Sequence, residues 1–315
     1  MKVVILESLG ISRDYLEKKE APFKEKGVEF AEFERTADTS RLIDEAKDAD
    51  AVIIANMPFP GEVISGCNKL KFIDIAFTGV DHVDINTAKA NGIKVSNASG
   101  YSNEAVAELA LGMVLSSLRN LRQVEDRCRA GQTKDGLIGS EIKGKTVGIV
   151  GLGKIGSRTA EIFNALGAKI VACNRRQIQS APDYISPVTM DELLALSDII
   201  ILHCPLNDST RGMFDAEKFS KMKRSAILVN VARGPVVNTA DLADALNNNT
   251  IAAAAIDVFD KEPPLSADEP LLHCKNILVT PHVAFATKES MILRADIVFD
   301  NLKAWMEGNQ INTVI

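Results

Sequence analysis

Paired cysteines, an excess of positive charge and long apolar runs are all missing from this 315-residue chain. Its five cysteines are scattered and form no CxxC pair, which argues against a disulfide scaffold and for a reducing compartment. The net charge of −6 argues against nucleic-acid binding, which requires a basic surface. No run reaches the ~18 apolar residues of a membrane span, and the opening MKVVILESLG lacks the pattern of a signal peptide. We therefore expect a cytoplasmic protein that binds neither membrane nor nucleic acid.

The length and composition indicate a globular protein with two domains. The chain is 46% hydrophobic and 25% charged, and 315 residues can form two substantial cores. Short apolar runs alternate with helix-like spacing, which predicts parallel sheets covered by helices. The predicted strands are 3–6, 28–33, 51–55, 72–76, 93–96, 147–150, 169–173, 199–202, 226–230, 253–257 and 277–280. The predicted helices are 41–49, 86–91, 104–129, 154–166, 189–196, 240–247 and 288–306.

The predicted helix over 104–129 is long enough to cross from one domain to another, and Gly131 ends it. The helix over 288–306 follows the second series of strands, so we expect the chain to return to the first domain. The sequence thus predicts an α/β protein with two Rossmann-like doubly wound parallel-sheet domains and an active-site cleft between them. The substrate domain is discontinuous, 1–100 and 286–315, and the nucleotide-binding domain is 101–285, including the linker helix.

The segment TVGIVGLGKIG places three glycines in the pattern GxGxxG between a predicted strand and a predicted helix. Gly151 permits a tight turn, Gly153 lets a pyrophosphate approach the backbone, and Gly156 lets the helix pack closely on the strand. The amide groups and dipole of the helix then favour phosphate. The alternative is a turn that serves packing alone, but the strand–loop–helix context favours a dinucleotide site.

The residue that normally binds the cofactor ribose is an asparagine in this chain. The next strand ends at Cys173, and Asn174 follows it, eighteen residues past Gly156. An acidic residue there would bind the 2′-hydroxyl and repel a 2′-phosphate, whereas Asn174 followed by Arg175 and Arg176 suits a phosphate. We therefore favour NADP(H) over NAD(H). The alternative is two solvated arginines beside an NAD site that tolerates either ribose.

Three residues with reactive or charged side chains follow later strands. Arg233 lies in LVNVARGPVVN, Glu262 in AIDVFDKEPP and His282 in LVTPHVAFAT. Ligands of open α/β sheets bind outside the carboxyl ends of the strands, so these residues point toward one crevice. Each residue has a structural alternative. Arg233 could cap a helix, Glu262 could be a solvated surface charge, and His282 could be a structural histidine whose hydrogen bonds are satisfied. Their occurrence at consecutive strand ends favours a site.

These motifs, with others, resemble one enzyme family. The chain contains FTGVDHVD, GYSNEAVAELALG, GLGKIG, HCPLNDSTRGM, VNVARG, DVFDKEP and TPHVAFAT. In order and spacing they resemble the D-isomer-specific 2-hydroxyacid dehydrogenase family over nearly the whole chain. The resemblance implies an NAD(P)-dependent oxidoreductase that acts on the CH–OH group of a 2-hydroxy acid. It also implies that His282 is the general acid/base, Glu262 its partner and Arg233 the residue that binds the substrate carboxylate.

The chemistry of the reduction agrees with these roles. A 2-keto acid needs a cation to hold its carboxylate, and an arginine can bind a carboxylate through two parallel hydrogen bonds. It also needs a proton donor as hydride arrives, and histidine is suited to this near neutral pH. A carboxylate beside that histidine favours the imidazolium, which keeps the acid protonated for reduction.

The resemblance also implies further ligand contacts. The cofactor contacts are Gly151, Gly153, Lys154, Ile155, Gly156, Asn174, Arg175, Arg176, His203, Cys204, Pro205, Thr210, Val231, Ala232, Arg233, Asp257, His282 and Asn103. For Asn103 the alternative role is a helix N-cap. The substrate contacts are Thr78, Gly79 and Val80 through backbone amides, with Arg233, Met57 and Phe285. The pairs His203–Cys204 and His273–Cys274 lack further ligands at workable spacing, so we expect no metal.

The segment after His282 reduces the number of candidate substrates. TPHVAFATKE followed by NLKAWMEG resembles the glycerate dehydrogenase/hydroxypyruvate reductase branch, which carries an aromatic residue at the position of Phe285. D-lactate dehydrogenases carry one too. Two hypotheses therefore stay open: reduction of hydroxypyruvate, with glyoxylate as a second substrate, and reduction of a broader set of 2-keto acids. The chain shows no cation cluster for a substrate phosphate, which disfavours phosphoglycerate.

A function of another class also stays open. Relatives of this fold serve as dinucleotide-sensing binding proteins, in which the cofactor stabilises a dimer. The intact set of Arg233, Glu262 and His282 favours the enzyme. The resemblance further implies a homodimer formed through the nucleotide domain and its linker helix. The alternative is a linker helix that packs only within its own subunit.

Overall fold

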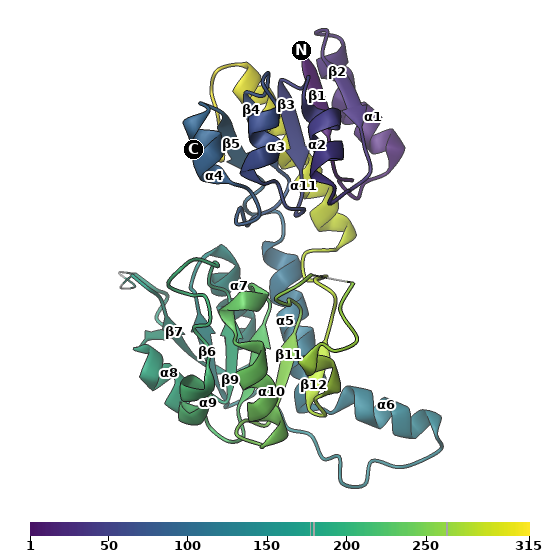
Figure 1. Cartoon of the computed structure of the whole chain (residues 1–315). Coiled ribbons are helices and arrows are strands. Elements are labelled where there is room, and N and C mark those ends of the chain that lie inside the picture. Colours follow the sequence, from purple (N-terminus) through teal and green to yellow (C-terminus); the bar gives the residue numbers. More distant parts are fainter. Residues whose placement is uncertain (177, 179, 263) are drawn as a thin grey trace. The chain divides into compact units, whose positions relative to one another are not determined.

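The computed structural model describes the chain except for Gln177, Gln179 and Pro263. The chain forms two compact units (Figure 1). Unit 1 contains Met1–Ser102 and Ala286–Ile315, and unit 2 contains Asn103–Phe285. Each unit holds a parallel sheet with helices, which confirms the predicted α/β class.

The sheet of unit 1 has the strand order β2-β1-β3-β4-β5, with parallel neighbours. Its strands are β1 (Lys2–Ile5), β2 (Glu29–Glu32), β3 (Ala51–Ile54), β4 (Phe72–Ile75) and β5 (Lys94–Asn97). β3 and β4 are buried along their whole length, as expected for nearly continuous apolar strands covered on both faces. The strand order changes direction between β1 and β3, and open sheets bind ligands at the carboxyl ends beside such a switch point.

Four of the unit 1 helices begin after a residue whose side chain caps the helix. The helices of this unit are α1 (Arg13–Lys24), α2 (Thr39–Ala46), α3 (Gly61–Gly66), α4 (Ile85–Ala90) and α11 (Lys288–Met306). Ser12, Asp38, Asp84 and Thr287 each accept a backbone N–H of the helix that follows. Helix α11 packs on β4, with the Trp305 and Phe72 rings stacked and their centroids 4.8 Å apart.

The sheet of unit 2 has the order β12-β11-β10-β9-β6-β7-β8, again parallel. Its strands are β6 (Thr146–Val150), β7 (Lys169–Cys173), β8 (Ile185–Pro187), β9 (Ile199–Leu202), β10 (Ile227–Asn230), β11 (Ala253–Ile256) and β12 (Ile277–Val279). The order changes direction between β6 and β9, which is the Rossmann-like switch point. The short strand β8 is absent from the sequence prediction because it offers just one buried residue.

The helices of unit 2 are α5 (Asn103–Leu118), α6 (Leu121–Arg129), α7 (Lys154–Ala165), α8 (Met190–Leu196), α9 (Ala216–Lys221) and α10 (Thr239–Asn247). Two 3₁₀ turns add η1 (Gly234–Val236) and η2 (Pro270–His273). Helix α5 is buried among α7, β10, β11 and β12. The apolar spacing over Asn103–Leu118 therefore reflects the burial of α5 in the core of unit 2.

The prediction of one continuous helix over 104–129 is wrong. The chain breaks at Asn120, which adopts a left-handed conformation with φ 52° and ψ 38°. Asparagine tolerates this conformation better than other residues with a Cβ atom, so the break is encoded locally. In α6, which the structure describes throughout, no residue is buried, and the helix projects from its unit in Figure 1.

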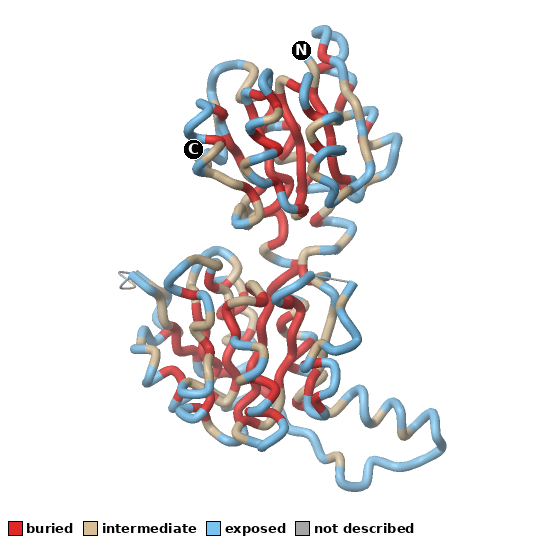
Figure 2. The backbone as a smooth tube through the Cα atoms, in the orientation of Figure 1, coloured by how far each residue is buried: buried red, intermediate tan, exposed pale blue. Residues whose placement is uncertain are grey.

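The buried residues follow the central strands of each sheet (Figure 2). In unit 2, one apolar cluster packs α8, α9 and α10 on one face of the sheet, and another packs α5 and α7 on the opposite face. Over the described ranges, no helix has the combination of length and apolar character that a bilayer span needs. The thiols of Cys67, Cys128, Cys173, Cys204 and Cys274 are all unbridged.

Candidate active site

In the glycine loop between β6 and α7, each glycine meets a different steric requirement. Gly151 has φ +99°, and a Cβ there would lie 2.7 Å from the backbone nitrogen of Cys204. A Cβ on Gly156 would lie 2.1 Å from the carbonyl oxygen of Gly151, so only glycine lets α7 approach the strand. A Cβ on Gly153, in contrast, meets no atom within 4 Å. The space beside Gly153 is open, as a pyrophosphate site at a helix N-terminus requires.

Asn174 follows β7 and closes this loop from the neighbouring strand. Its Oδ1 accepts the backbone N–H of Leu152 at 2.5 Å, while the carbonyl of Cys173 accepts the N–H of Gly151 at 3.0 Å. The amide oxygen is thus engaged by the loop, and no residue outside the three undescribed positions accepts from the two N–H groups of the same side chain. Arg175 and Arg176 come next and are exposed. The predicted ribose-binding segment therefore starts at the edge of the glycine loop.

The segment after β9 forms the other border of the glycine loop. The N–H of His203 donates to the carbonyl of Val150 at 2.8 Å. Thr210 closes the turn that follows, because its hydroxyl donates to the carbonyl of Pro205 at 2.7 Å and accepts from the N–H of Asn207 at 2.9 Å. Part of His203 reaches the surface, but its Nε2 is buried without a partner among the described residues, and burial lowers the pKa of His203 to about 3. His203 is therefore a neutral ring near pH 7.

Arg233 follows β10, and hydrogen bonds from the side chain of Asn230 hold the backbone at this position. The side chain of Asn230 accepts the N–H of Ala232 at 3.0 Å and donates to the carbonyl of Arg233 at 2.9 Å. Next to it, a Cβ on Gly234 would lie 2.0 Å from the carbonyl carbon of Phe259, so the loops after β10 and β11 touch there. Arg233 is half-buried, and its guanidinium donates to the carbonyl of Ala232 at 2.9 Å.

His282 and Glu262 form the hydrogen-bonded pair that the sequence predicted as the acid/base and its partner. Nδ1 of His282 lies 2.9 Å from Oε2 of Glu262. The histidine side chain is 11% exposed and that of Glu262 is 39% exposed. With Nδ1 oriented by the carboxylate, Nε2 is the ring nitrogen suited to proton transfer. The Phe285 ring meets the imidazole edge to face, with centroids 5.4 Å apart.

Asp257, immediately after β11, holds the backbone around His282. Its carboxylate is fully buried and accepts the hydroxyl of Thr280 at 2.5 Å and the N–H groups of Val283 and Ala284 at 2.9 Å each. Its carbonyl accepts the N–H of His282 at 2.7 Å. Burial raises the pKa of Asp257, and the bonds from Thr280, Val283 and Ala284 oppose that rise. These bonds fix His282 in a left-handed conformation with φ 54°, which would otherwise be unfavourable.

In unit 1, the turn predicted to bind a carboxylate lies at the carboxyl end of β4. Thr78, Gly79 and Val80 are all partly accessible. Among the described residues, none accepts the backbone N–H of Gly79 or Val80, and the hydroxyl of Thr78 is buried without a partner. Successive unbonded donors in one turn make a concave site for an anion.

Met57 follows β3 and is completely buried. Glu7, just after β1, accepts the N–H groups of Ala55 and Met57 at 2.7 and 2.9 Å. Arg35 lies 3.4 Å from Glu7 and donates to the side chain of Asn56 at 3.1 Å. Glu7 therefore fixes the loop that carries Met57, and contact between Met57 and substrate stays a prediction.

The remaining predicted contacts occupy the strand ends of unit 2. Val231 and Ala232 are buried after β10, Ile155 and Lys154 open α7, and Asn103 is the first residue of α5. Within the part of the chain that the structure describes, no group of His, Cys, Asp or Glu side chains is placed to bind a metal ion. The sequence analysis overlooked Asn230 and Glu7, although a polar residue at the end of an apolar strand is a usable signal for both.

Comparisons with known proteins agree with this arrangement. Residues 111–284 match the model of the "D-isomer specific 2-hydroxyacid dehydrogenase, NAD binding domain". The chain is 35% identical to a hydroxypyruvate reductase of Blautia hydrogenotrophica, over 100% of this chain and 99% of that protein. It is also 35% identical to a glycerate dehydrogenase of Methylorubrum extorquens, over 91% and 92% of the two chains. An acyclic imino acid reductase (Bsp5), solved with NADPH and D-Arg, superposes with a TM-score of 0.91 at 27% identity over all of both chains.

The glycine loop generates a test that separates binding from packing. Gly153→Ala should keep the free energy of unfolding within about 1 kcal/mol of the unaltered protein, because its Cβ meets nothing within 4 Å. It should weaken dinucleotide binding by about tenfold or more, since the methyl enters the pyrophosphate space. Gly156→Ala should lose about 1–3 kcal/mol of stability by overpacking. Urea unfolding and calorimetric titration measure the two effects, and normal cofactor affinity in Gly153→Ala would contradict this interpretation of the loop.

Proposed function

Because the chain belongs to the D-isomer specific 2-hydroxyacid dehydrogenase family, we propose that it reduces hydroxypyruvate to D-glycerate, with glyoxylate as a second substrate. The protein is an oxidoreductase that acts on CH–OH donors. The names of the relatives from Blautia hydrogenotrophica and Methylorubrum extorquens support this substrate. The cytoplasmic location expected from the sequence stays a prediction.

The paired His282 and Glu262 carry the proposal. A bound nicotinamide supplies the hydride that reduces the keto carbon. His282 donates a proton from Nε2 to the oxygen of that carbonyl, so that one hydride and one proton convert the ketone to an alcohol. Glu262, at 2.9 Å from Nδ1, orients the ring so that Nε2 is the nitrogen that transfers the proton. In the reverse direction the neutral imidazole accepts the proton of the alcohol.

Two further groups hold the substrate. The guanidinium of Arg233 binds its carboxylate and polarises the adjacent carbonyl. The amides of Gly79 and Val80 and the hydroxyl of Thr78, all without partners among the described residues, bind an anionic group in the same manner. The ring of Phe285, edge to face with His282, is suited to limit the space for the substrate side chain, which favours a small substrate.

The first test is turnover of a panel of 2-keto acids. Hydroxypyruvate should give the highest kcat/KM, glyoxylate a lower one and pyruvate a low one. His282→Gln should reduce kcat by at least about 10²-fold, the usual range of general acid catalysis. His273→Gln is the matched control, because that exposed histidine lies in η2 and bonds locally, to the carbonyl of Ala267. A best rate with another keto acid would replace the substrate. Tight dinucleotide binding without turnover of any member would favour a dinucleotide-sensing protein instead.

The cofactor is a nicotinamide dinucleotide, and we propose that NADP(H) is preferred over NAD(H). Asn174 brings no negative charge to the position after β7, and its oxygen is already bonded to the N–H of Leu152. Its amide N–H groups and the exposed Arg175 and Arg176 are donors suited to a 2′-phosphate. The NADPH complex of the imino acid reductase shows that a protein of similar fold accepts this cofactor.

The ratio of kcat/KM with NADPH to that with NADH measures the preference. We expect a ratio of about ten or more, equivalent to about 1.4 kcal/mol. Arg175→Ala should remove most of it, whereas Arg224→Ala should leave it unchanged. Arg224 is a fair control because it lies before β10, at the opposite ends of the strands, and donates to the carbonyl of Asn249. Equal rates with both cofactors would show that Asn174 tolerates either ribose.

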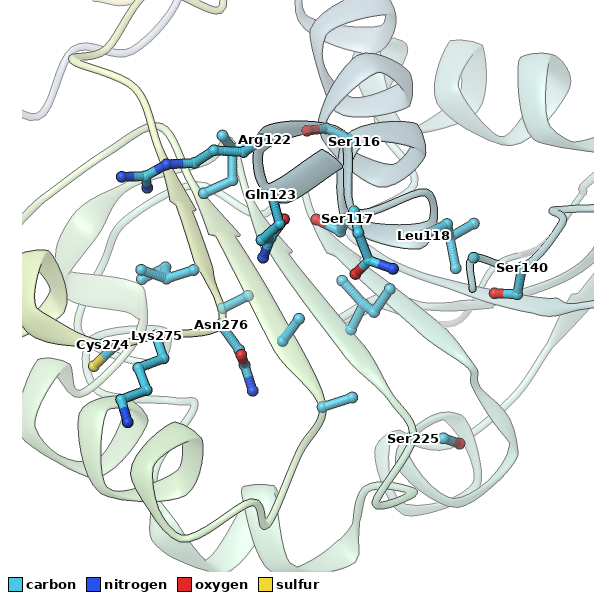
Figure 3. Close-up of a pocket in the computed structure, with 18 of the residues that line it drawn as sticks. Ser116, Ser117, Leu118, Arg122, Gln123, Ser140, Ser225, Cys274, Lys275 and Asn276 are labelled. Atoms are coloured by element: carbon cyan, nitrogen blue, oxygen red, sulfur yellow. The ribbon is translucent and has the colours of Figure 1, made fainter. Parts of the chain in front are cut away.

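We also propose that the protein is a homodimer formed through unit 2. A groove of about 660 Å³ runs along the amino ends of β9–β12, beside the junction of α5 and α6 (Figure 3). This edge is opposite to the carboxyl ends that carry the glycine loop, Arg233 and His282, so a substrate site is not expected there. Leu121 and Ile138 near the groove are 49% and 86% exposed. A second copy of the same surface supplies apolar groups to cover them.

Light scattering at micromolar concentration tests the dimer. The expected mass is twice the 34.1 kDa of the chain. Ile138→Lys should shift the equilibrium toward the monomer, because it places a charge in the proposed interface. Leu196→Lys, at a residue of α8 that is 48% exposed, is the matched control and should stay dimeric. A monomeric unaltered protein would reject the proposal.

A further inference from the structure

The carboxylate-binding turn of unit 1 is held at its far end, where the carbonyl of Val80 accepts the N–H of Val83 at 3.1 Å. It begins at Thr78, shortly after β4 ends at Ile75, and within the described ranges its amides at Gly79 and Val80 bond to no acceptor. A turn that keeps its donors unbonded must be fixed through its carbonyl groups or its neighbours, because it has given up its own internal bonds. The inference below rests on the proposed function, in which this turn binds the substrate carboxylate.

Asn97 supplies a bond at the start of the turn. It is the last residue of β5, the strand beside β4, and its Nδ2 donates to the carbonyl of Thr78 at 2.7 Å. This bond holds the Thr78 carbonyl toward β5. The N–H of Gly79 belongs to the same trans peptide unit as the Thr78 carbonyl and points roughly opposite to it. The amide of Gly79 is therefore directed away from the sheet. Asn97 thus fixes the direction of the Gly79 N–H, the first donor of the turn.

Asn97 is itself held by a buried amide from the far end of the chain. Asn301, on α11 and fully buried, donates through Nδ2 to the carbonyl of Asn97 at 3.1 Å and to Oδ1 of Asp74 at 2.9 Å. Asp74 lies within β4, four residues before Thr78, and is also fully buried. Burial raises the pKa of Asp74 well above its usual range, which favours a neutral carboxyl group in this core.

The C-terminal segment completes the arrangement. Nδ2 of Asn312 donates to Oδ1 of Asn301 at 2.8 Å, and the carbonyl of Asn312 accepts the N–H of Asn97 at 3.1 Å. Asn312 adopts a left-handed conformation with φ 47°, for which asparagine is well suited. The side chain of Asn301 is therefore satisfied on both its donor and its acceptor side, which fixes its orientation.

We propose that Asn97, oriented by Asn301 between Asp74 and Asn312, is a positioning residue that aims the backbone donors of the Thr78–Val80 turn at the substrate carboxylate. The polar side chains in this core cost desolvation and contribute no apolar packing. Asn301 bonds Asp74, the carbonyl of Asn97 and Asn312 together, so the network fixes the position of Asn97 beside the turn.

Asn97→Ala tests the proposal through a split between KM and kcat. Loss of the bond to Thr78 should let the turn rotate, which weakens binding of the carboxylate equally in ground and transition states. We expect KM for hydroxypyruvate to rise by about tenfold with kcat within about twofold, since uniform binding appears in KM alone. Binding of oxalate, a non-reacting dianion, should weaken by a similar factor. The affinity for NADPH should not change, because the glycine loop belongs to unit 2.

Asn91→Ala is the matched control. Its Nδ2 also donates to a backbone carbonyl of unit 1, that of Thr87 at 2.9 Å, but at the exposed end of α4. It should leave KM, kcat and oxalate binding unchanged. Asn312→Ala is a second test, since it removes one bond to Asn301 and keeps both donors of Asn301 in place. It should also raise KM for hydroxypyruvate, but by a smaller factor than Asn97→Ala.

Two results would overturn the inference. One is a folded Asn97→Ala protein with unaltered KM and oxalate affinity, which would show that the turn is held without Asn97. The other is a parallel decline of kcat, NADPH affinity and thermal stability, which would indicate a general structural role. If Asn97→Ala does not fold, an unchanged KM in Asn312→Ala has the same meaning. Failure of the proposed function is separate, because it appears as absent turnover in the unaltered protein, while oxalate binding still compares the variants.

Discussion

Polar side chains at the carboxyl ends of parallel strands hold the loops of this protein in place. Asn97 ends β5, Asn174 follows β7, Asn230 ends β10 and Asp257 follows β11, and each bonds to the backbone of a nearby loop. A parallel sheet brings these ends to one edge, where the ladder of strand hydrogen bonds stops and loop backbone groups need other partners. The loops with predicted ligand contacts are therefore fixed by short side chains that the strands themselves position.

Asp257 shows what such a side chain can impose. A buried carboxylate without partners would be costly, so its bonds to Thr280, Val283 and Ala284 are strongly specified. The conformation of the loop follows from those bonds, including the left-handed backbone of His282. The imidazole then reaches the carboxylate of Glu262, which comes from a different loop. The contact between His282 and Glu262 thus depends on a second carboxylate, that of Asp257, which bonds to neither side chain.

The two ends of the strands in unit 2 serve different purposes. The carboxyl ends carry the glycine loop, Arg233 and His282, while the amino ends border the groove beside α5 and α6. The break at Asn120 matters for this division, because it turns α6 away from the core in which α5 is buried. A continuous helix would have kept the same axis and left the groove with a different wall.

The sequence by itself determined the α/β class and the glycine loop between a strand and a helix, and it predicted the roles of Arg233, Glu262 and His282. These depend on local patterns, namely apolar strand runs, glycines that tolerate close approach and charged residues after strands. Only the tertiary structure decided how side chains distant in sequence combine. Asp74, Asn97, Asn301 and Asn312 are ordinary polar residues in the sequence, and no local spacing relates them. They meet because α11 returns to the sheet of unit 1, and a buried amide must find partners wherever folding places it.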